Sequence, residues 1–289
     1  VIAPLGVGKT TFLTKVASTA FLEGKTVLQI FFEDKEEAVQ RKHFSALTGI
    51  PLSELSEQKD LIHRKIGTIK GEHKNDLFLQ KLPADGVTIN KIKNIIKKIN
   101  SKGTKVDVLV LDYIDCLSME KETSNSEEWS NEGKIMRAFE TMVDEMNVAG
   151  WTATQGNRSS TSVEVVKTEN MGGNLKKAQI AHVILSIGKT LEQKEHNLAT
   201  LTLLKSRIGK DGVVFQNCTF NNEYLVINTD KSATLGQFLE AASTYIGKCR
   251  TNATKNILNS IVNIATIRHQ DFLAFCCTIR FKTTAVLAI

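Results

Sequence analysis

The chain has 289 residues, of which 37 are lysine or arginine and 31 are aspartate or glutamate, for a net charge of +6. Its hydrophobic fraction of 42% is ordinary for a globular protein, and a content of only three prolines argues against disorder as the main state. No apolar run reaches the roughly 18 residues that a membrane-spanning helix needs, so we expect no association with a membrane. Net charge alone does not indicate a nucleic-acid partner.

The start of the sequence and its cysteines indicate whether the chain is a fragment and where it is located. The sequence begins at Val1 rather than at methionine, almost at its first motif, which we interpret as a fragment boundary with at least part of a strand missing upstream. No signal-peptide pattern is present. The five cysteines lack the spacing of a zinc site, and an odd number without a secretion signal favours a cytoplasmic location over a disulfide framework.

In chain order, the hydrophobic pattern predicts alternating strands and helices. Helices are predicted after a glycine-rich loop at residues 9–23 and at residues 36–49, 89–100 and 127–147. Strands are predicted at residues 26–32, 76–82, 106–115, 150–157, 182–188, 199–207, 213–220 and 224–228. Residues 52–76 carry no clear pattern, and residues 157–174 predict a loop. The alternation predicts an α/β fold whose mostly parallel sheet is flanked by helices, with antiparallel strands at one edge.

The strongest motif is the segment APLGVGKT at residues 3–10, which matches the P-loop pattern with alanine in place of the first glycine. Small residues let backbone N–H groups wrap around phosphate oxygens, and the helix that follows presents its positive end to the same anion. Lys9 would reach the β- and γ-phosphates of ATP, and the hydroxyl of Thr10 would bind Mg²⁺. The predicted nucleotide-binding residues are Ala3, Gly6, Val7, Gly8, Lys9, Thr10 and Thr11.

The second motif is the apolar run VDVLVLD at residues 106–112. An acid at the carboxyl end of a buried strand beside a P-loop is what the Mg²⁺ shell requires, so Asp112 is predicted as a metal-binding residue together with Thr10. Many strands of α/β proteins end in aspartate, and it is the upstream P-loop that gives the pattern its weight. Asp115 is interpreted as a helix cap or a solvated acid.

A third candidate, Glu33, follows the strand predicted at residues 26–32. Hydrolysis needs a carboxylate that orients or deprotonates the attacking water, and a strand-end glutamate beside the P-loop could do this. It could equally be an acid at the start of the next helix, which the helix dipole favours. Asp34 competes for either role, and Glu127 and Glu128 are weaker alternatives.

Two further strand ends carry polar groups. Gln155 ends the strand predicted at residues 150–157 and could sense the γ-phosphate, although an unpartnered strand-terminal glutamine is common. Lys205 and Arg207 end a later strand and could reach the ATP of a neighbouring subunit as an arginine finger does. A solvated basic hairpin is the commoner fate of such residues.

Together these segments resemble a known family. The order APLGVGKTT, IFFED, VLVLDYID, WTATQGNR and LLKSRIG resembles the RecA-like motor domain of DnaB-type replicative helicases, in a form closest to those of T-even-like phages. The resemblance extends to about residue 229, so we expect a motor domain at residues 1–230. Residues 231–289 would be an appendage, either helical or an aberrant translated end, and receive no function.

The resemblance implies roles by position. Glu33 is similar to the family's catalytic glutamate, Gln155 to its γ-phosphate sensor, and Lys205 and Arg207 to the pair that completes the neighbour's active site. Lys9 belongs to the same catalytic group. Residues 158–174 and 117–133 resemble the two loops that line the channel for single-stranded DNA, and the predicted DNA-binding residues are Arg158, Lys167, Asn170, Gly172 and Gly173.

The implied function is an ATP- and Mg²⁺-dependent helicase, a hexameric ring that translocates 5′ to 3′ on single-stranded DNA, with primase and a helicase loader as further partners. If the protein is phage-encoded, its location is the host cytoplasm. We expect an N-terminally truncated helicase that lacks the family's loading domain. The predicted channel loops also lack an aromatic stacking platform.

Two other functions remain open on the sequence. A RecA-type recombinase would carry its catalytic glutamate at a similar place, and the Lys-x-Arg pair at residues 205–207 favours the helicase over it. A nucleotide-binding scaffold without DNA is the third possibility. The basic residues do not decide between them, because residues 231–289 hold seven bases against two acids, a net of +5, which leaves +1 for residues 1–230.

Overall fold

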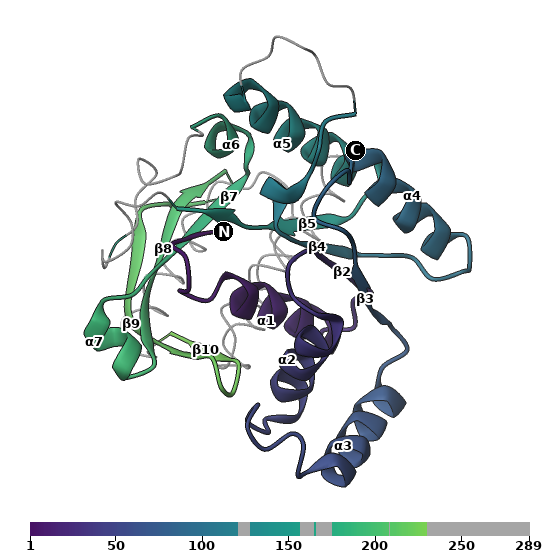
Figure 1. The fold of residues 1–289 in the computed structure, drawn as a ribbon, viewed down its shortest axis with the longest axis vertical. Coiled ribbons are helices and arrows are strands. Elements are labelled where there is room, and N and C mark those ends of the chain that lie inside the picture. The colour runs from purple at the N-terminus through teal and green to yellow at the C-terminus, as the bar shows by residue number, and fades with distance from the viewer. Residues whose placement is uncertain (121–127, 157–164, 166–174, 208, 230–289) are drawn as a thin grey trace, which may run out of the picture.

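The computed structural model describes residues 1–120, 128–156, 165, 175–207 and 209–229 (Figure 1). The helices are α1 (Lys9–Leu22), α2 (Glu36–Thr48), α3 (Lys59–Glu72), α4 (Ile89–Asn100), the 3₁₀ turn η1 (Ile114–Cys116), α5 (Glu128–Glu145), α6 (Leu175–Ile180) and α7 (Leu191–Glu195). The strands are β1 (Ile2–Ala3), β2 (Val27–Phe31), β3 (Leu77–Lys81), β4 (Val108–Asp112), β5 (Ala149–Thr152), β6 (Thr154–Gln155), β7 (Val183–Gly188), β8 (Leu198–Ser206), β9 (Val213–Asn221) and β10 (Val226–Asn228).

The strands form two sheets that share one run of chain. The first has the order β3-β2-β4-β5 and is parallel throughout, and the second has the order β10-β9-β8-β7-β1-β6. In the second sheet β1 is parallel to β6 and β7, whereas β7 to β10 are antiparallel. Only Ala153 separates β5 from β6. The first half of the run Ala149–Gln155 therefore pairs with β4 and the second half with β1.

Helices cover both faces of the parallel strands, as β4 shows most directly. Val108 and Val110 pack in the apolar core that includes α1, whereas Leu109 and Leu111 pack in the core that includes α4 and α5. Because successive side chains of a strand point to opposite faces, one five-residue strand connects the two cores. Figure 1 shows α1 and α2 on one side of β2 and β4, with α4 and α5 on the other.

The predicted α/β fold, with a mostly parallel sheet and antiparallel strands at one edge, is confirmed. The helix predicted at residues 89–100 has those same bounds as α4. The strand predicted at residues 106–115 is shorter, because the chain turns into η1 after Asp112. The strand predicted at residues 150–157 is divided into β5 and β6, because its two halves pair with different neighbours.

Three helices were not predicted from the sequence. In α3 only Ile62 is buried, although Ile66 and Ile69 recur at helical spacing and pack against the core while partly exposed. Helices α6 and α7 have six and five residues, too few for a periodic pattern. The start of α7 is held by a capping box between Thr190 and Gln193, a local signal that its five residues do carry. The loop predicted at residues 157–174 lies outside the described residues except for Val165.

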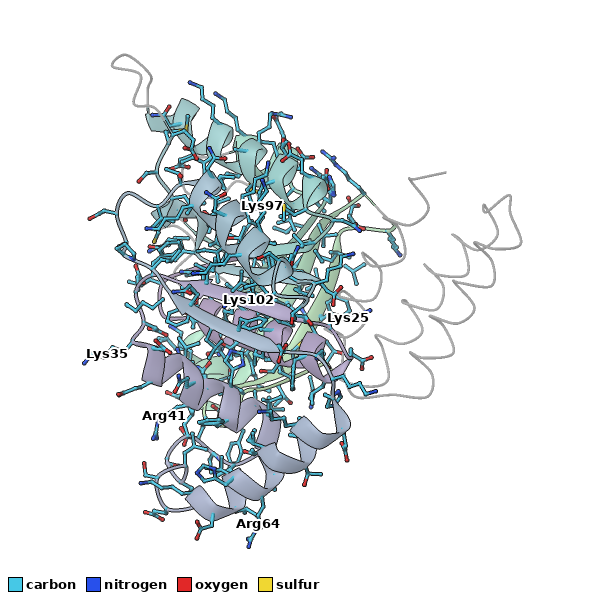
Figure 2. The ribbon with its side chains drawn as sticks, turned by 90° about the vertical axis from the view of Figure 1, so that its right-hand side faces the viewer. Lys25, Lys35, Arg41, Arg64, Lys97 and Lys102 are labelled. Atoms are coloured by element: carbon cyan, nitrogen blue, oxygen red, sulfur yellow. The ribbon has the colours of Figure 1, made fainter. Side chains whose placement is uncertain are left out.

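Helix α4 separates its apolar and basic side chains. Ile92 and Ile96 are fully buried, whereas Lys97 is exposed. Figure 2 labels Lys97 and, just beyond the helix, Lys102 on the outer side of α4, with Arg64 projecting from α3 at the far end of the same view.

Among the described residues, no helix has both the length and the apolar character to cross a membrane.

Candidate nucleotide site

The P-loop joins β1 to α1 and owes its shape to two glycines. Gly6 has φ +73° and Gly8 has φ +113°, backbone conformations that L side chains rarely adopt. A Cβ added to Gly8 would also lie 2.7 Å from Cε1 of Phe220, on β9. Ala3 lies within β1, paired with Gln155, so alanine is tolerated where the P-loop pattern has its first glycine.

One pocket lies where the carboxyl ends of three neighbouring strands meet the start of α1. Its lining comes from four places in the sequence, which are the P-loop and α1, the end of β2, the end of β4, and β6. The lining residues are Leu5, Lys9, Thr10, Phe31, Glu33, Asp34, Asp112, Tyr113 and Gln155. In parallel α/β sheets ligands bind at the carboxyl ends of the strands, and this pocket has that position.

Thr10 and Asp112, the two predicted metal-binding residues, line the same pocket, although they lie about a hundred residues apart in the sequence. Burial raises the pKa of Asp112, and the nearby hydroxyl of Thr10 and the charge of Lys9 act in the opposite direction. A hydroxyl and a carboxylate oxygen are ligands that Mg²⁺ accepts, so the pair fits that ion.

Lys9 lies among acids in the same pocket. Burial lowers the pKa of its ammonium group, and the charges of Asp112, Asp115 and Glu33 raise it again. The nitrogen lies 5.9 Å from the centroid of the Tyr113 ring. A half-buried cation with acids around it and a P-loop in front of it is suited to bind a multiply charged anion.

Glu33 is held at the pocket by contacts that the sequence did not indicate. The ammonium group of Lys81, on β3, donates to the carbonyls of Phe32, Glu33 and Asp34 at 3.0, 3.1 and 2.6 Å. The hydroxyl of Tyr113 donates to Oε1 of Glu33 at 3.0 Å. These bonds fix the backbone of the loop and the carboxylate at its tip.

The surroundings of Glu33 differ from those of its rivals. Helix α2 begins at Glu36 with Lys35 as its cap residue, so Glu33 is not the helix-terminal acid. Its rival Asp34 also lines the pocket, but its carboxylate forms an ion pair with Lys42 of α2 at 2.6 Å. Of the two weaker alternatives, Glu127 lies outside the described residues and Glu128 is the first residue of α5.

Asp115, interpreted as a helix cap or a solvated acid, does lie at an exposed position, but its carboxylate also has partners within the fold. Its carboxylate accepts hydrogen bonds from the Thr154 hydroxyl at 3.0 Å and from the backbone N–H of Gln155 at 3.3 Å. It also forms an ion pair with Lys177 of α6. Asp115 therefore connects the end of β4 to the strand that carries Gln155, and its partners come from parts of the sequence 39 to 62 residues away.

Lys205 and Arg207 lie away from this pocket. Lys205 pairs with Ile184 near the start of β7, while Ser186, farther along the same strand, pairs with Ile2 of β1. Since β1 and β7 are parallel and the P-loop follows β1, the two cations lie toward the opposite end of the sheet from the P-loop. Lys205 donates to the carbonyl oxygens of Ala178 and Gln179, and Arg207 to that of Gln179, at 2.6 to 2.9 Å.

Comparison with known proteins agrees with this arrangement. Residues 1–228 match the model of the DnaB-like helicase C-terminal domain. The chain belongs to this family. No curated protein sequence matches it.

Two solved structures share the fold of this DnaB-like domain. One, described as the structure of a DnaB-like replicative helicase and its interactions with primase, has a TM-score of 0.65 and 18% identity. The match covers 78% of this chain and 55% of that one, so this domain spans about half the length of that helicase. The other, described as an ATPase domain, has a TM-score of 0.64 and 19% identity, over 78% of this chain and 82% of that one.

The predicted DNA-binding residues of the DnaB-like domain could not be placed. Arg158, Lys167, Asn170, Gly172 and Gly173 all lie outside the described residues. The predictions for them therefore still rest on the sequence alone.

Three residues of this domain that contact the pocket or its supporting acids were not predicted from the sequence. Lys81 carries no local signal, because its role depends on β3 pairing beside β2. Tyr113 was noted only as part of the family pattern, and its hydroxyl is the partner of Glu33. Lys177 is a lysine in a short unpredicted helix, and only its burial beside two carboxylates distinguishes it.

Proposed function

We propose that this DnaB-like domain is the ATP-hydrolysing motor of a replicative DNA helicase, and that the pocket at the P-loop is its catalytic site. The observation that carries the proposal is the convergence of Lys9, Thr10, Glu33, Asp112 and Gln155 on one pocket. These residues come from four separate segments, and each is of the type that phosphoryl transfer from ATP to water requires.

Each residue has a defined task in this mechanism. The P-loop amides and Lys9 bind the β- and γ-phosphates, and Thr10 and Asp112 would hold Mg²⁺, which supplies positive charge for the developing phosphate anion. Glu33 orients a water molecule and takes its proton as the oxygen attacks the γ-phosphorus and the bond to the β-phosphate breaks. The Tyr113 hydroxyl keeps the carboxylate in position, and Gln155 contacts the γ-phosphate.

The position of Lys205 and Arg207 supports a ring of subunits. Because they lie toward the opposite end of the sheet from the P-loop, they cannot serve the pocket of their own chain. A head-to-tail arrangement would bring them to the pocket of the next subunit, and such an interface closes into a ring when its rotation permits. We propose a hexamer, in which the pair stabilises charge on the neighbour's ATP.

The partners belong to the same proposal. Single-stranded DNA would pass through the ring in contact with residues 158–174 and 117–133, and translocation would run 5′ to 3′. One similar structure is a helicase described with its primase, which supports primase as a partner here, and a helicase loader is a further candidate. A phage origin, with the host cytoplasm as location, is also part of this proposal.

A mixing experiment tests the shared site. We expect R207A to bind ATP but to lose turnover by roughly 10³-fold or more, as loss of an arginine finger does. E33A should be similarly inactive. Mixed rings should regain activity, because some interfaces then combine an intact Glu33 with an intact Arg207.

The matched control is a mixture of E33A and K9A, in which every pocket is damaged and no interface can recover. If R207A and E33A subunits mix and no activity returns, the shared site is wrong. Open filaments on DNA in electron micrographs would favour the recombinase, and ATP hydrolysis that single-stranded DNA does not stimulate would favour a scaffold module.

A further inference from the structure

Lys177 is a buried cation outside the nucleotide pocket. Its side chain is only 6% exposed, and its ammonium group contacts two carboxylates, Oδ1 of Asp115 and, at 2.8 Å, Oε2 of Glu132. The two acids come from η1 and from α5, so one lysine on α6 joins three elements. Only the lysine is buried, since the side chains of Asp115 and Glu132 are 23% and 35% exposed. Removing its partners would leave the buried ammonium group uncompensated, which is unfavourable, so these elements are expected to move together rather than separate.

Asp115 connects Lys177 to the nucleotide pocket. Its carboxylate accepts hydrogen bonds from the Thr154 hydroxyl and from the backbone N–H of Gln155, and Gln155 lines the pocket. Asp115 also follows Asp112 by three residues, so it is tied to both strand ends that border the site. A shift of either strand end would move the Asp115 carboxylate and, with it, the ammonium group of Lys177.

Helix α6, which carries Lys177, also contacts Lys205 and Arg207 at the end of β8. Helix α6 ends next to Lys205 and Arg207, which donate to the carbonyl oxygens of Ala178 and Gln179. The side chain of Lys176 on α6 also packs on α5, because a Cβ added to Gly133 would lie 3.1 Å from it. Figure 1 shows α6 beside α5 and above the end of β7.

We propose that Lys177 is a positioning residue that couples the nucleotide pocket of one subunit to its Lys205–Arg207 pair. The proposal rests on the function proposed above, in which that pair serves the neighbouring subunit. Loss of the γ-phosphate shifts β6 and Asp115, the ion pair carries Lys177 and α6 with them, and the carbonyls at the end of α6 reposition the two cations. Because α6 directly follows residues 158–174, the same motion reaches the segment proposed to contact DNA.

Four variants of the full chain separate this role from a purely structural one. K177M removes the charge and keeps most of the side-chain length, and K177R restores the charge. D115N breaks the ion pair, and its amide oxygen can still accept from Thr154 and Gln155. E132Q removes only the ion pair between Lys177 and α5.

Steady-state ATP hydrolysis is measured with and without a poly-dT oligonucleotide. We expect KM for ATP to stay within about twofold in K177M, while the stimulation of kcat by DNA falls at least about fivefold, the usual lower size of an allosteric coupling. D115N should behave like K177M, the double variant should be no worse than either, and K177R should recover most of the stimulation.

A second measurement does not depend on turnover. Hydrogen exchange is followed with and without a non-hydrolysable ATP analogue. In the parent chain the analogue should slow exchange at the start of α1 and also in α6 and at residues 203–207. In K177M only the protection of α1 should remain, which shows at once that the variant is folded and binds nucleotide.

The outcomes distinguish the two proposals. If K177M and D115N match the parent in DNA stimulation and in the protection of α6, the coupling role of Lys177 is overturned and the proposed function stands. If the analogue does not protect α1 in the parent chain, the proposed function itself fails, and the coupling proposal fails with it. If K177M does not fold, D115N carries the test by the same two criteria.

Discussion

Acidification should destabilise the domain through one histidine. His43, on α2, is 2% exposed and is hydrogen-bonded on both ring nitrogens. Nδ1 lies 2.9 Å from the Ser18 hydroxyl of α1, and Nε2 lies 2.9 Å from Oε1 of Gln29 on β2. The neutral ring satisfies both partners, since Nε2–H donates to Gln29 and Nδ1 accepts from Ser18. A protonated ring could not accept from Ser18.

The size of the effect follows from the pKa. Burial, and to a lesser degree the charge of Lys42, lowers the pKa of His43 from 6.5 to about 3. The unfolded chain therefore binds a proton below pH 6.5 that the folded chain does not. The stability that this provides is present above pH 6.5 and is lost as the pH falls from there toward 3. Between pH 8 and pH 5 the loss is about 2 kcal/mol, at about 1.4 kcal/mol per pH unit.

The assay is urea unfolding at pH 8, 6.5, 5.75 and 5 for the parent chain and for H43Q, in which glutamine can still bond to Ser18 and Gln29. The free energy of unfolding of the parent should fall by about 2 kcal/mol more than that of H43Q over this range. H63Q, at an exposed position on α3, is the control and should follow the parent. Equal pH slopes for the parent and H43Q would refute the argument.

Three further predictions concern the P-loop and the core. K9A should lower ATP affinity and abolish turnover, because the phosphates lose their cation, as isothermal titration and a phosphate-release assay would show. G8A should cost more stability and more nucleotide affinity than G6A, because both positions have positive φ and only a Cβ on Gly8 meets Phe220. G150A should lower the free energy of unfolding by about 1–3 kcal/mol without changing KM for ATP, because the added Cβ would lie 2.7 Å from Val143 Cγ1.

Each of these has a contrary result. Turnover retained in K9A would remove the P-loop assignment. Equal losses in G8A and G6A would mean that the contact with Phe220 relaxes at no cost. A G150A chain as stable as the parent would show that β5 and α5 can move apart enough to accommodate the added Cβ without loss of packing.

Local patterns predicted the elements whose environment is uniform along their length. In α4 the isoleucines recur at helical spacing because the helix lies flat on the sheet, and its predicted and observed bounds agree. β4 is buried on both faces and appears as a continuous apolar run. Helix α3 was not predicted, although Ile62, Ile66 and Ile69 recur at helical spacing, because the polar residues between them leave it at the periphery of the fold with Ile62 as its one buried residue.

Pairing that depends on tertiary structure could not be predicted in this way. The run from Ala149 to Gln155 shows no sequence signal for its change of partner at Ala153, because both halves are equally extended. Glu33 and Asp34 could not be ranked from their order, since Lys42 and Tyr113, which distinguish them, come from other elements. Asp115 is exposed, as predicted, but its bonds to Thr154, Gln155 and Lys177 depend on tertiary structure in the same way.

The central claim is that the pocket formed by the P-loop and the ends of β2, β4 and β6 hydrolyses ATP with Glu33 as the base. The most direct test is single-turnover ATP hydrolysis by E33Q and the parent chain, in the presence of Mg²⁺ and single-stranded DNA, with ATP affinity measured on the same samples. The account predicts that E33Q keeps its affinity within about threefold and loses at least about 10²-fold in rate, the usual contribution of a general base. An E33Q rate equal to that of the parent would contradict it.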